Sequence, residues 1–264
     1  MRFLIFLLVI FTFISCTNEP IRAGNPYATT VAETNTNDSI LYGIEDRIMR
    51  KFVNSMARND ISPIDELIGQ LEQGYEQHQQ NLFRYWQAYA LFHKGIYHVQ
   101  YDESRAAEKA TDKAINLLQG LSEKTSEDFA LLAFLQGFSI QFKAGIKAPF
   151  ISAKSSKNAR IALDMAPNNP RAYYVLGNND YYTPTQFGGG EEVVTHLEQA
   201  ISLARQQPNN PYLPSWGAED AYERLIRFYE REDQQDKVQE TIDRALQAFP
   251  DSYRLNELAG ALSK

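Results

Sequence analysis

The chain has one cysteine, Cys16, and only four histidines among its 264 residues. A single thiol has no partner for an intramolecular disulfide, and it cannot form a cysteine-based zinc site. The histidines lie at positions 78, 93, 98 and 196, without an HExxH motif or another metal-ligand spacing. We therefore predict no metal site and no cofactor, and we expect His93 to pack among aromatic residues.

Basic residues are also scarce, with 26 Lys and Arg against 33 Asp and Glu and a net charge of -7. No basic stripe is visible, so the composition argues against nucleic-acid binding. A Gly-x-Ser-x-Gly motif is absent, and the Glu219-Asp220 pair reads as first-turn helix charges. The sequence thus predicts a protein that is not an enzyme. A hydrolase whose two catalytic carboxylates are far apart in the sequence but close in space stays an alternative, because sequence spacing does not reveal such a pair.

Long apolar runs are confined to the first fifteen residues, MRFLIFLLVIFTFIS, where one arginine precedes a stretch too short to span a bilayer comfortably. We interpret 1–15 as a secretory signal peptide. Phe13-Ile14-Ser15-Cys16 resembles a bacterial lipobox, which implies removal of the signal before Cys16 and lipidation of that cysteine. An ordinary signal peptide or a membrane-anchoring helix are the alternatives.

An acyl chain contributes about 0.8 kcal/mol per buried methylene, so a lipidated Cys16 would hold the protein firmly on a membrane. Thr17 follows the cysteine, and by analogy with other lipoproteins this favours an outer-membrane position facing the periplasm. Residues 16–37 read as the lipidated cysteine and a flexible tether, rich in Thr, Asn, Ala and Glu and interrupted by Pro20 and Pro26.

Alternating strand patterns are missing from 38–264, which instead show helical periodicity throughout and predict one all-α domain. Ile40, Ile44, Ile48, Phe52 and Met56 are four residues apart. Ser62-Pro63 is typical of a helix start. A last helix near 253–262 is expected to cap the domain, because terminal caps keep repeat stacks soluble.

The clearest repeated unit spans 219–252. Its first half places Tyr222, Leu225 and Tyr229 on one helix face, and its second half contains Val238, Ile242 and Ala245 before Pro250. This spacing resembles the tetratricopeptide repeat (TPR), with Ile226 where glycine or alanine is usual. The resemblance implies a right-handed α-solenoid of helix pairs.

Three looser copies precede this unit. Their terminal small residues, Ala114, Ala162 and Ala200, are separated from one another and from Ala245 by 48, 38 and 45 positions. These intervals exceed the roughly 34-residue TPR length, so we expect longer inter-helix turns or helix ends.

Phe187-Gly188-Gly189-Gly190 is a conspicuous glycine-rich stretch. It lacks a preceding strand and a following Lys-Ser/Thr, and Glu191 and Glu192 would repel an anion. We therefore predict a tight inter-helix turn with Phe187 packed in the core, not a phosphate-binding loop.

In TPR proteins, the first helix of each pair lines a concave groove. Carried over to this chain, the resemblance implies partner contacts from Arg84, Gln87, Lys94, Phe134, Phe138, Gln141, Tyr174, Asn178, Tyr181, Tyr182, Glu223, Arg227 and Arg231. Aromatic residues with a polar tip suit peptide or sugar recognition. Packing against neighbouring helices is the alternative role for Tyr174, Tyr181 and Tyr182.

Three functional hypotheses follow. The leading one is a membrane-anchored scaffold that binds a protein or peptide partner in the cell envelope. The second is a protein that binds a small molecule and serves an uptake system. The third is a hydrolase built on an α-helical toroid, which would require a buried acidic pair facing a deep pocket.

Overall fold

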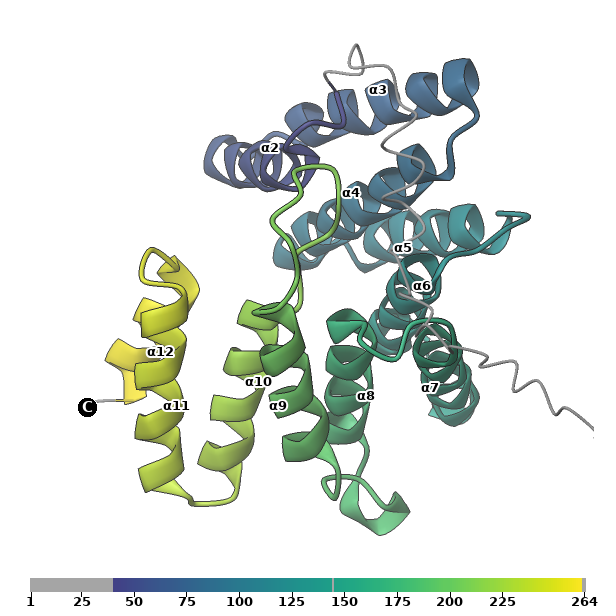
Figure 1. Ribbon diagram of the computed structural model, residues 1–264. Helices are drawn as coiled ribbons and strands as arrows, with labels where there is room; N and C mark the ends of the chain where they lie inside the picture. The colour runs from purple at the N-terminus through teal and green to yellow at the C-terminus, as the bar shows by residue number, and fades with distance from the viewer. Residues whose placement is uncertain (1–39, 144, 263–264) are drawn as a thin grey trace, which may run out of the picture.

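The computed structural model describes residues 40–143 and 145–262, and every regular element in these ranges is a helix, as predicted. The predicted signal 1–15, Cys16 and the tether 16–37 lie outside the described residues. Figure 1 shows the succession of helices: α2 Ile44–Arg58, α3 Ser62–His78, α4 Asn81–Gln100, α5 Ser104–Gln119, α6 Ser126–Ser139, α7 Ala148–Met165, α8 Pro170–Tyr182, α9 Val193–Ala204, α10 Ala218–Arg231, α11 Gln235–Ala248 and α12 Tyr253–Leu262.

Consecutive helices pack in pairs: α2 with α3, α4 with α5, α6 with α7, α8 with α9, and α10 with α11. The first helices of neighbouring pairs also touch in series, from α2 to α4, α6, α8 and α10. The chain is therefore an α-solenoid of TPR-like pairs, and α12 packs against α10 and α11 at its C-terminal end, as expected of a cap. The pair α2/α3 precedes the four pairs that the repeat pattern indicated.

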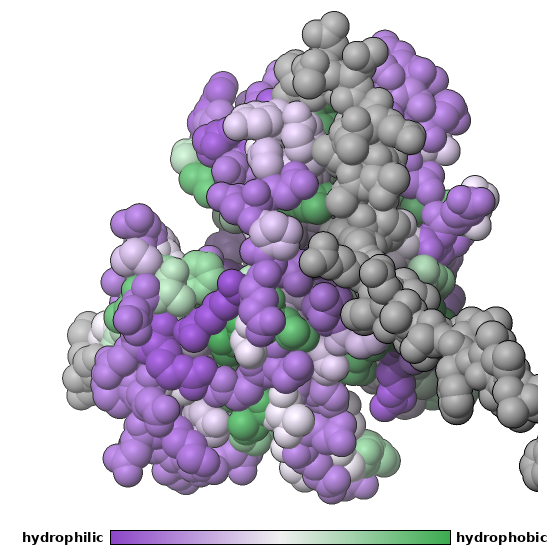
Figure 2. Space-filling model, viewed as in Figure 1, coloured by the Kyte–Doolittle hydropathy of each residue, from purple (hydrophilic) through white to green (hydrophobic). Residues whose placement is uncertain are grey.

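Close helix crossings explain the small residues of the repeat. Ala114, Ala162, Ala200 and Ala245 are at most 1% exposed. At Gly177, a Cβ atom would lie 2.7 Å from Leu197 Cδ2, so α8 and α9 approach where no side chain separates them. The outer surface is more polar than these helix crossings. The face in Figure 2 is largely hydrophilic, with small apolar areas among the hydrophilic residues.

Local sequence signals set several helix ends. Thr125 and Asp128 form a reciprocal capping box at the start of α6. The Asn169 side chain accepts hydrogen bonds from the amides of Arg171 and Ala172, and Pro170 fills the first position of α8. Four short turns end their helices with a residue at positive φ: Asn59, Gln79, Asp102 and Asp233.

Besides the connection 183–192 between α8 and α9, two connections are long, which confirms the prediction from the repeat spacing. Residues 140–147 join α6 to α7 through the 3-10 turns η1 Ile140–Phe142 and η2 Gly145–Lys147. Residues 205–217 join α9 to α10 without regular structure, and we call them the 205–217 segment. These insertions fall in the two longest repeat intervals, 48 and 45 residues.

The glycine-rich stretch forms a turn, but the placement of Phe187 was wrong, because its side chain is 74% exposed. A Cβ on Gly189 would lie 1.8 Å from the carbonyl oxygen of Thr183, so only glycine fits there. The Asp180 carboxylate accepts hydrogen bonds from the amides of Gly190 and Glu192. Backbone contacts therefore hold this turn, and it needs no aromatic side chain in the core.

Candidate binding site on the concave face

The predicted groove residues of α4 do not line the groove. Arg84 lies 4.0 Å over the ring of Tyr75 and 3.7 Å from Glu72, both on α3. Gln87 is completely buried and accepts a 2.6 Å hydrogen bond from Arg84. The repeat register taken for α4 was wrong, because Arg84 faces the preceding helix and Gln87 is buried.

Lys94 follows the same pattern. Its ammonium group donates hydrogen bonds of 2.6 and 2.9 Å to the two carboxylate oxygens of Asp65 on α3. His93, next to it, is buried against Phe52, Tyr89 and Phe92, as expected for an aromatic packing position. The side chains of α4 that face α6 are aromatic residues. None of them is among the groove residues that the repeat register predicted for α4.

An aromatic cluster occupies the concave side between α4, α6 and α8. Trp216 lies at its centre, with ring centroids 5.3 Å from Phe134, 6.1 Å from Tyr89 and 6.2 Å from Tyr174. Phe92 completes the cluster, 4.9 Å from both Phe134 and Phe138. Of the predicted groove residues, Phe134 and Tyr174 thus pack against each other and against Trp216, and Phe138 packs against Phe92.

Trp216 belongs to the 205–217 segment, which crosses to the N-terminal helices. Its indole N–H donates to the Tyr85 hydroxyl at 2.7 Å, and the carbonyl of Tyr212 accepts from Trp86 Nε1 at 3.1 Å. The Gly43 amide donates to the carbonyl of Pro211. The segment therefore fills the N-terminal half of the concave side, and its sequence signals are the 45-residue repeat interval and the prolines around this tryptophan.

A second cluster remains accessible between α8 and α10, and we call it the arginine–tyrosine cluster: Tyr181, Tyr182, Arg224 and Arg231. The Arg224 guanidinium lies 4.7 Å from the ring centroids of both Tyr181 and Tyr182. Arg231 lies 4.5 Å from that of Tyr181 and donates to its carbonyl oxygen. Tyr182 is 64% exposed.

Arg224 has one polar partner in the structure, since its Nε–H donates to Asn178 Oδ1 at 3.0 Å. Within the described ranges, no carboxylate lies at ion-pair distance from this guanidinium. An arginine that is partly buried, stacked on two tyrosines and not neutralised is a ready site for an anion. The repeat register found Asn178, Tyr181, Tyr182 and Arg231 but missed Arg224.

The remaining predicted residues lie at the edges of this region. Gln141 is exposed and donates to the carbonyl of Phe138. Glu223 is 3.5 Å from Arg254 of α12, and Arg227 is 3.2 Å from Glu230. Glu223 and Arg227 are thus engaged in ion pairs within the C-terminal helices.

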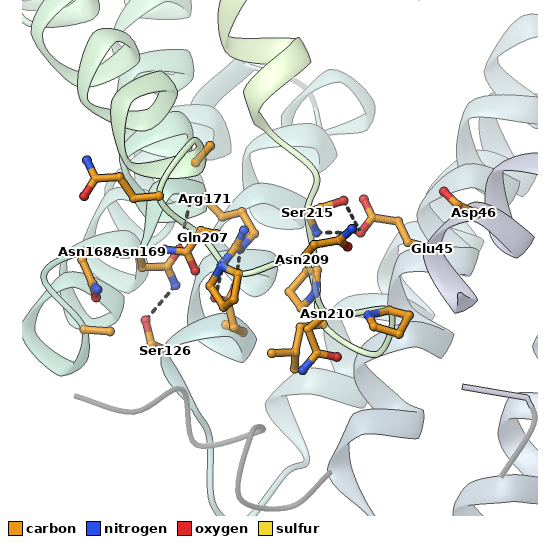
Figure 3. A pocket seen from close by; sticks show the side chains of 18 of the residues that line it. Glu45, Asp46, Ser126, Asn168, Asn169, Arg171, Gln207, Asn209, Asn210 and Ser215 are labelled. Atoms are coloured by element: carbon orange, nitrogen blue, oxygen red, sulfur yellow. Dashed lines mark hydrogen bonds and ion pairs between the residues drawn. The ribbon is translucent and has the colours of Figure 1, made fainter. Parts of the chain in front are cut away.

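A pocket of about 880 Å³ lies beside the 205–217 segment, which forms part of its wall. In Figure 3, Glu45 and Asp46 from the start of α2 lie on one side, with Ser126, Asn168 and Asn169 on the other. Side-chain amides and prolines of the segment form much of the wall. The size is that of a small-molecule site, and polar side chains stand among a lining surface that is mostly apolar.

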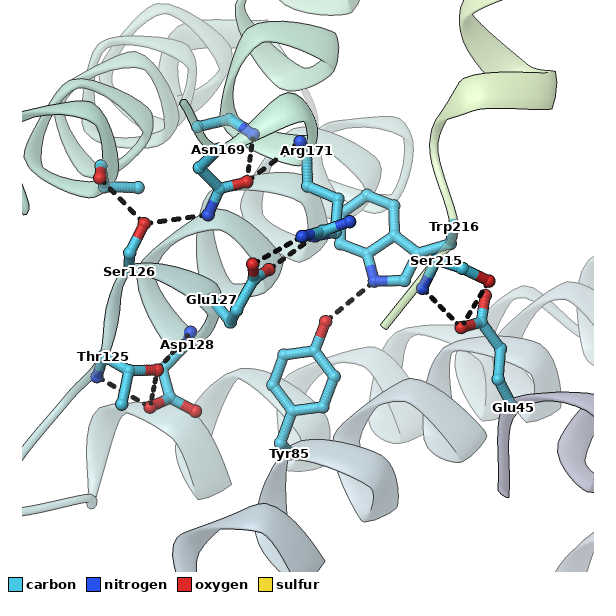
Figure 4. Close-up of polar contacts among 12 residues, drawn as sticks. Glu45, Tyr85, Thr125, Ser126, Glu127, Asp128, Asn169, Arg171, Ser215 and Trp216 are labelled. Carbon is cyan, nitrogen blue, oxygen red and sulfur yellow. Dashed lines mark hydrogen bonds and ion pairs between the residues drawn. The ribbon is translucent and has the colours of Figure 1, made fainter. Parts of the chain in front are cut away.

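Two carboxylates of this pocket, Glu45 and Glu127, have partners. Glu45 accepts from the Ser215 amide at 2.6 Å and from its hydroxyl at 3.1 Å, while burial raises the pKa of Glu45 to about 7. Glu127 receives two 2.6 Å hydrogen bonds from Arg171, and both side chains are nearly inaccessible (Figure 4). These contacts hold the pocket walls together. No group of three potential metal ligands occurs among the described residues.

Comparisons with known proteins support the fold class. No family model and no curated protein matches the sequence. Among solved structures, the HusA haemophore from Porphyromonas gingivalis is 22% identical with a TM-score of 0.54, covering 73% of this chain and 96% of that one. A thermophilic TPR protein from Thermus thermophilus is 10% identical with a TM-score of 0.53, covering 81% and 98%. The chain is thus similar in fold to helical-repeat proteins that include a haemophore.

None of the helices within the described ranges is long and apolar enough to cross a bilayer.

Proposed function

We propose that this protein is a non-catalytic binding scaffold that holds an anionic segment of a protein or peptide partner on the arginine–tyrosine cluster. The observation that carries this proposal is the Arg224 guanidinium, stacked on Tyr181 and Tyr182 without a carboxylate partner in the described structure. A carboxylate of the partner would accept hydrogen bonds from its two terminal nitrogens. The tyrosine rings would cover the apolar part of the segment.

The position of this cluster defines how a partner would bind. Trp216 fills the N-terminal half of the concave side, so the partner contacts α8 and α10 instead of the whole groove. Arg231, at the C-terminal end of α10 beside Tyr181 of α8, is a second cation of the cluster and is paired with the exposed Glu232 at 3.2 Å. The footprint is short, which suits a peptide terminus or a single acidic turn.

The cellular setting is part of the proposal. A lipid on Cys16 would anchor the chain to the outer membrane facing the periplasm, and residues 17–37 would let the domain reach its partner. The lipobox-like sequence supports this placement. Partner capture at a membrane also explains why a scaffold would carry an anchor.

Photo-crosslinking from position 182 tests the partner. The full chain with a photoreactive residue at this exposed site is expressed in its native membranes, crosslinked, purified and read by mass spectrometry. We expect one reproducible envelope protein, and we expect Arg224→Leu to lower its yield about 10- to 100-fold, because a charge-assisted hydrogen bond contributes roughly 1.5–3 kcal/mol.

Arg227→Ala is the matched control, since Arg227 lies on the same helix but is paired with Glu230. It should leave the crosslink yield near that of the unmodified chain. If Arg224→Leu and Tyr181→Ala/Tyr182→Ala keep every partner of the wild type, the cluster is not the binding site.

The second candidate is capture of a small molecule for an uptake system. It is favoured by the fold similarity to a haemophore over 96% of that protein, and a flat anionic ligand such as haem would also suit tyrosines and arginines. A haem titration followed by absorbance, together with a metabolite thermal-shift screen, tests it. A saturable spectral change that Arg224→Leu removes, in a chain without a protein partner, would replace the scaffold proposal.

A further inference from the structure

The 35 residues from Phe129 to Leu163 contain no aspartate or glutamate, although the whole chain has 33 acidic residues. The same stretch contains five cations: Lys143, Lys147, Lys154, Lys157 and Arg160. The stretch is therefore locally basic within a protein that is acidic as a whole. The structure shows where this charge is presented.

Four residues form an outward stripe along the start of α7. Lys147, Phe150, Lys154 and Lys157 are spaced by three, four and three positions, so they lie on one side of the helix. The opposite side of α7 is buried in the solenoid through Ser155, Asn158, Ala159 and Ala162. All four residues of the stripe are exposed.

Two apolar side chains project from the same end. Phe150 is 74% exposed, and Ile146 in the preceding 3-10 turn η2 is 87% exposed. Side chains as accessible as these are protruding points, not the walls of a groove. A protein partner would need a matching cavity for each, whereas a lipid surface deforms around them.

The lysines around these points are unneutralised. Lys147, Lys154 and Lys157 form no ion pair with any described residue, in contrast to Lys143, which lies 2.7 Å from Asp112. Exposed cations beside protruding apolar side chains are the composition of an interfacial membrane contact, in which lysines meet anionic headgroups and the apolar residues enter the acyl boundary.

We propose that η2 and the first half of α7 form a membrane-binding face for bilayers that contain anionic lipids. Ile146 and Phe150 enter the bilayer interface, and Lys147, Lys154 and Lys157 contact headgroup phosphates. This face is distinct from the arginine–tyrosine cluster and does not depend on the proposed partner or on lipidation of Cys16.

Vesicle flotation of the full chain tests the proposal, using phosphatidylcholine vesicles with and without phosphatidylglycerol. We expect the anionic vesicles to bind more protein, with the difference lost at high salt. Lys147→Glu/Lys154→Glu/Lys157→Glu should lower partitioning to anionic vesicles at least about 100-fold, since each basic residue near such a surface contributes roughly 1 kcal/mol. Ile146→Ser/Phe150→Ser should weaken binding to the same vesicles.

Two matched controls separate this face from general charge and exposure. Arg50→Glu/Arg105→Glu/Lys109→Glu makes the same change in net charge elsewhere on the surface. Phe187→Ser removes an equally exposed phenylalanine that is followed by Glu191 and Glu192. Both controls should bind like the wild type. Residues 1–15 are present in all variants, so their contribution to vesicle binding is the same in each and does not affect the comparison between variants.

Hydrogen exchange on anionic vesicles locates the contact, with protection expected in residues 145–157. Equal losses in the control and test charge reversals would overturn the proposal, as would equal binding to neutral and anionic vesicles. Unchanged vesicle binding by the test variants, with an acidic protein crosslinked at position 150, would assign the face to that protein and overturn the lipid proposal.

Discussion

Two ionisable residues, the buried His93 and the partly buried Glu45, respond to pH in opposite directions. Burial lowers the pKa of His93 from 6.5 to about 4, and burial raises the pKa of Glu45 from 4.5 to about 7. Neutral His93 contributes stability that is complete above pH 6.5 and is lost as pH falls towards 4. Protonated Glu45 contributes stability that is complete below pH 4.5 and is lost as pH rises through 7. The two effects nearly cancel between pH 4.5 and 6.5.

Single substitutions that remove one of the two groups should reveal the pH dependence of stability that the other contributes. In Glu45→Gln, the free energy of unfolding should rise with pH between 4 and 6.5, with a slope up to about 1.4 kcal/mol per pH unit, because the unfolded chain alone protonates His93. In His93→Phe, it should fall between pH 4.5 and 7. Urea titrations across this range measure both. A wild-type slope as steep as that of either variant would contradict the compensation.

The buried pair of Glu127 and Arg171 should behave as a unit. Both side chains are at most 6% exposed. Glu127→Leu leaves an unpaired buried charge and should cost about 3–5 kcal/mol of unfolding free energy. Glu127→Leu/Arg171→Met removes both charges and should recover most of that loss. A double-mutant cycle in urea measures the coupling, and additive losses would show that the pair is not coupled.

At the scale of elements, the helix pair is the stable unit and α12 closes the stack. Leu255 and Leu258 are buried beneath it, and Arg254 bonds to Glu219 and Asp220 of α10. Because α12 contacts mainly α10 and α11, damage to the cap should remain local.

Leu255→Ala/Leu258→Ala tests this locality. The double substitution should lower protection from hydrogen exchange in α10, α11 and α12 while α4 and α5 keep theirs, since each buried leucine contributes about 2–5 kcal/mol. Arg254→Ala is a milder comparison, because an ion pair this exposed contributes about 0–1 kcal/mol. Uniform loss of protection along the chain would argue against a locally coupled cap.

At the scale of the whole molecule, the 205–217 segment adds long-range contacts to a solenoid whose helix pairs otherwise contact mainly their neighbours. Through Trp216, Ser215 and Tyr212 it contacts α2 and α4, more than 100 residues earlier in the chain. Contacts of this range couple the N-terminal pairs to the C-terminal pairs. Cooperative unfolding of the entire domain is the expected consequence.

Trp216→Ala should remove this coupling. It should cost about 3–5 kcal/mol and split urea unfolding into two transitions, with exchange increased in 205–217 and at the start of α2. Trp216→Phe keeps an aromatic ring but not the hydrogen bond to Tyr85, so it should lose only about 1 kcal/mol. A single unchanged transition in Trp216→Ala would show that the segment does not couple the two halves.

The sequence by itself determined the helical class, the pairing of helices and the need for long connections. These features follow from local physics: apolar residues at helical spacing, alanines where helices cross, and the capping residues Thr125, Asn169 and Pro170 that begin helices. The last repeat was read in register because its Tyr222, Leu225 and Ile242 recur at the expected positions, and all three are buried.

Only the tertiary structure decided which side chains meet across the molecule. Arg84 and Lys94 face α3 because the register of α4 depends on its neighbour, which a repeat pattern does not contain. Trp216 fills the groove through contacts more than 100 residues apart, and no local periodicity encodes such a contact. Arg224 has no carboxylate partner among the residues that the structure describes for the same reason: whether a charge is neutralised depends on packing, not on spacing.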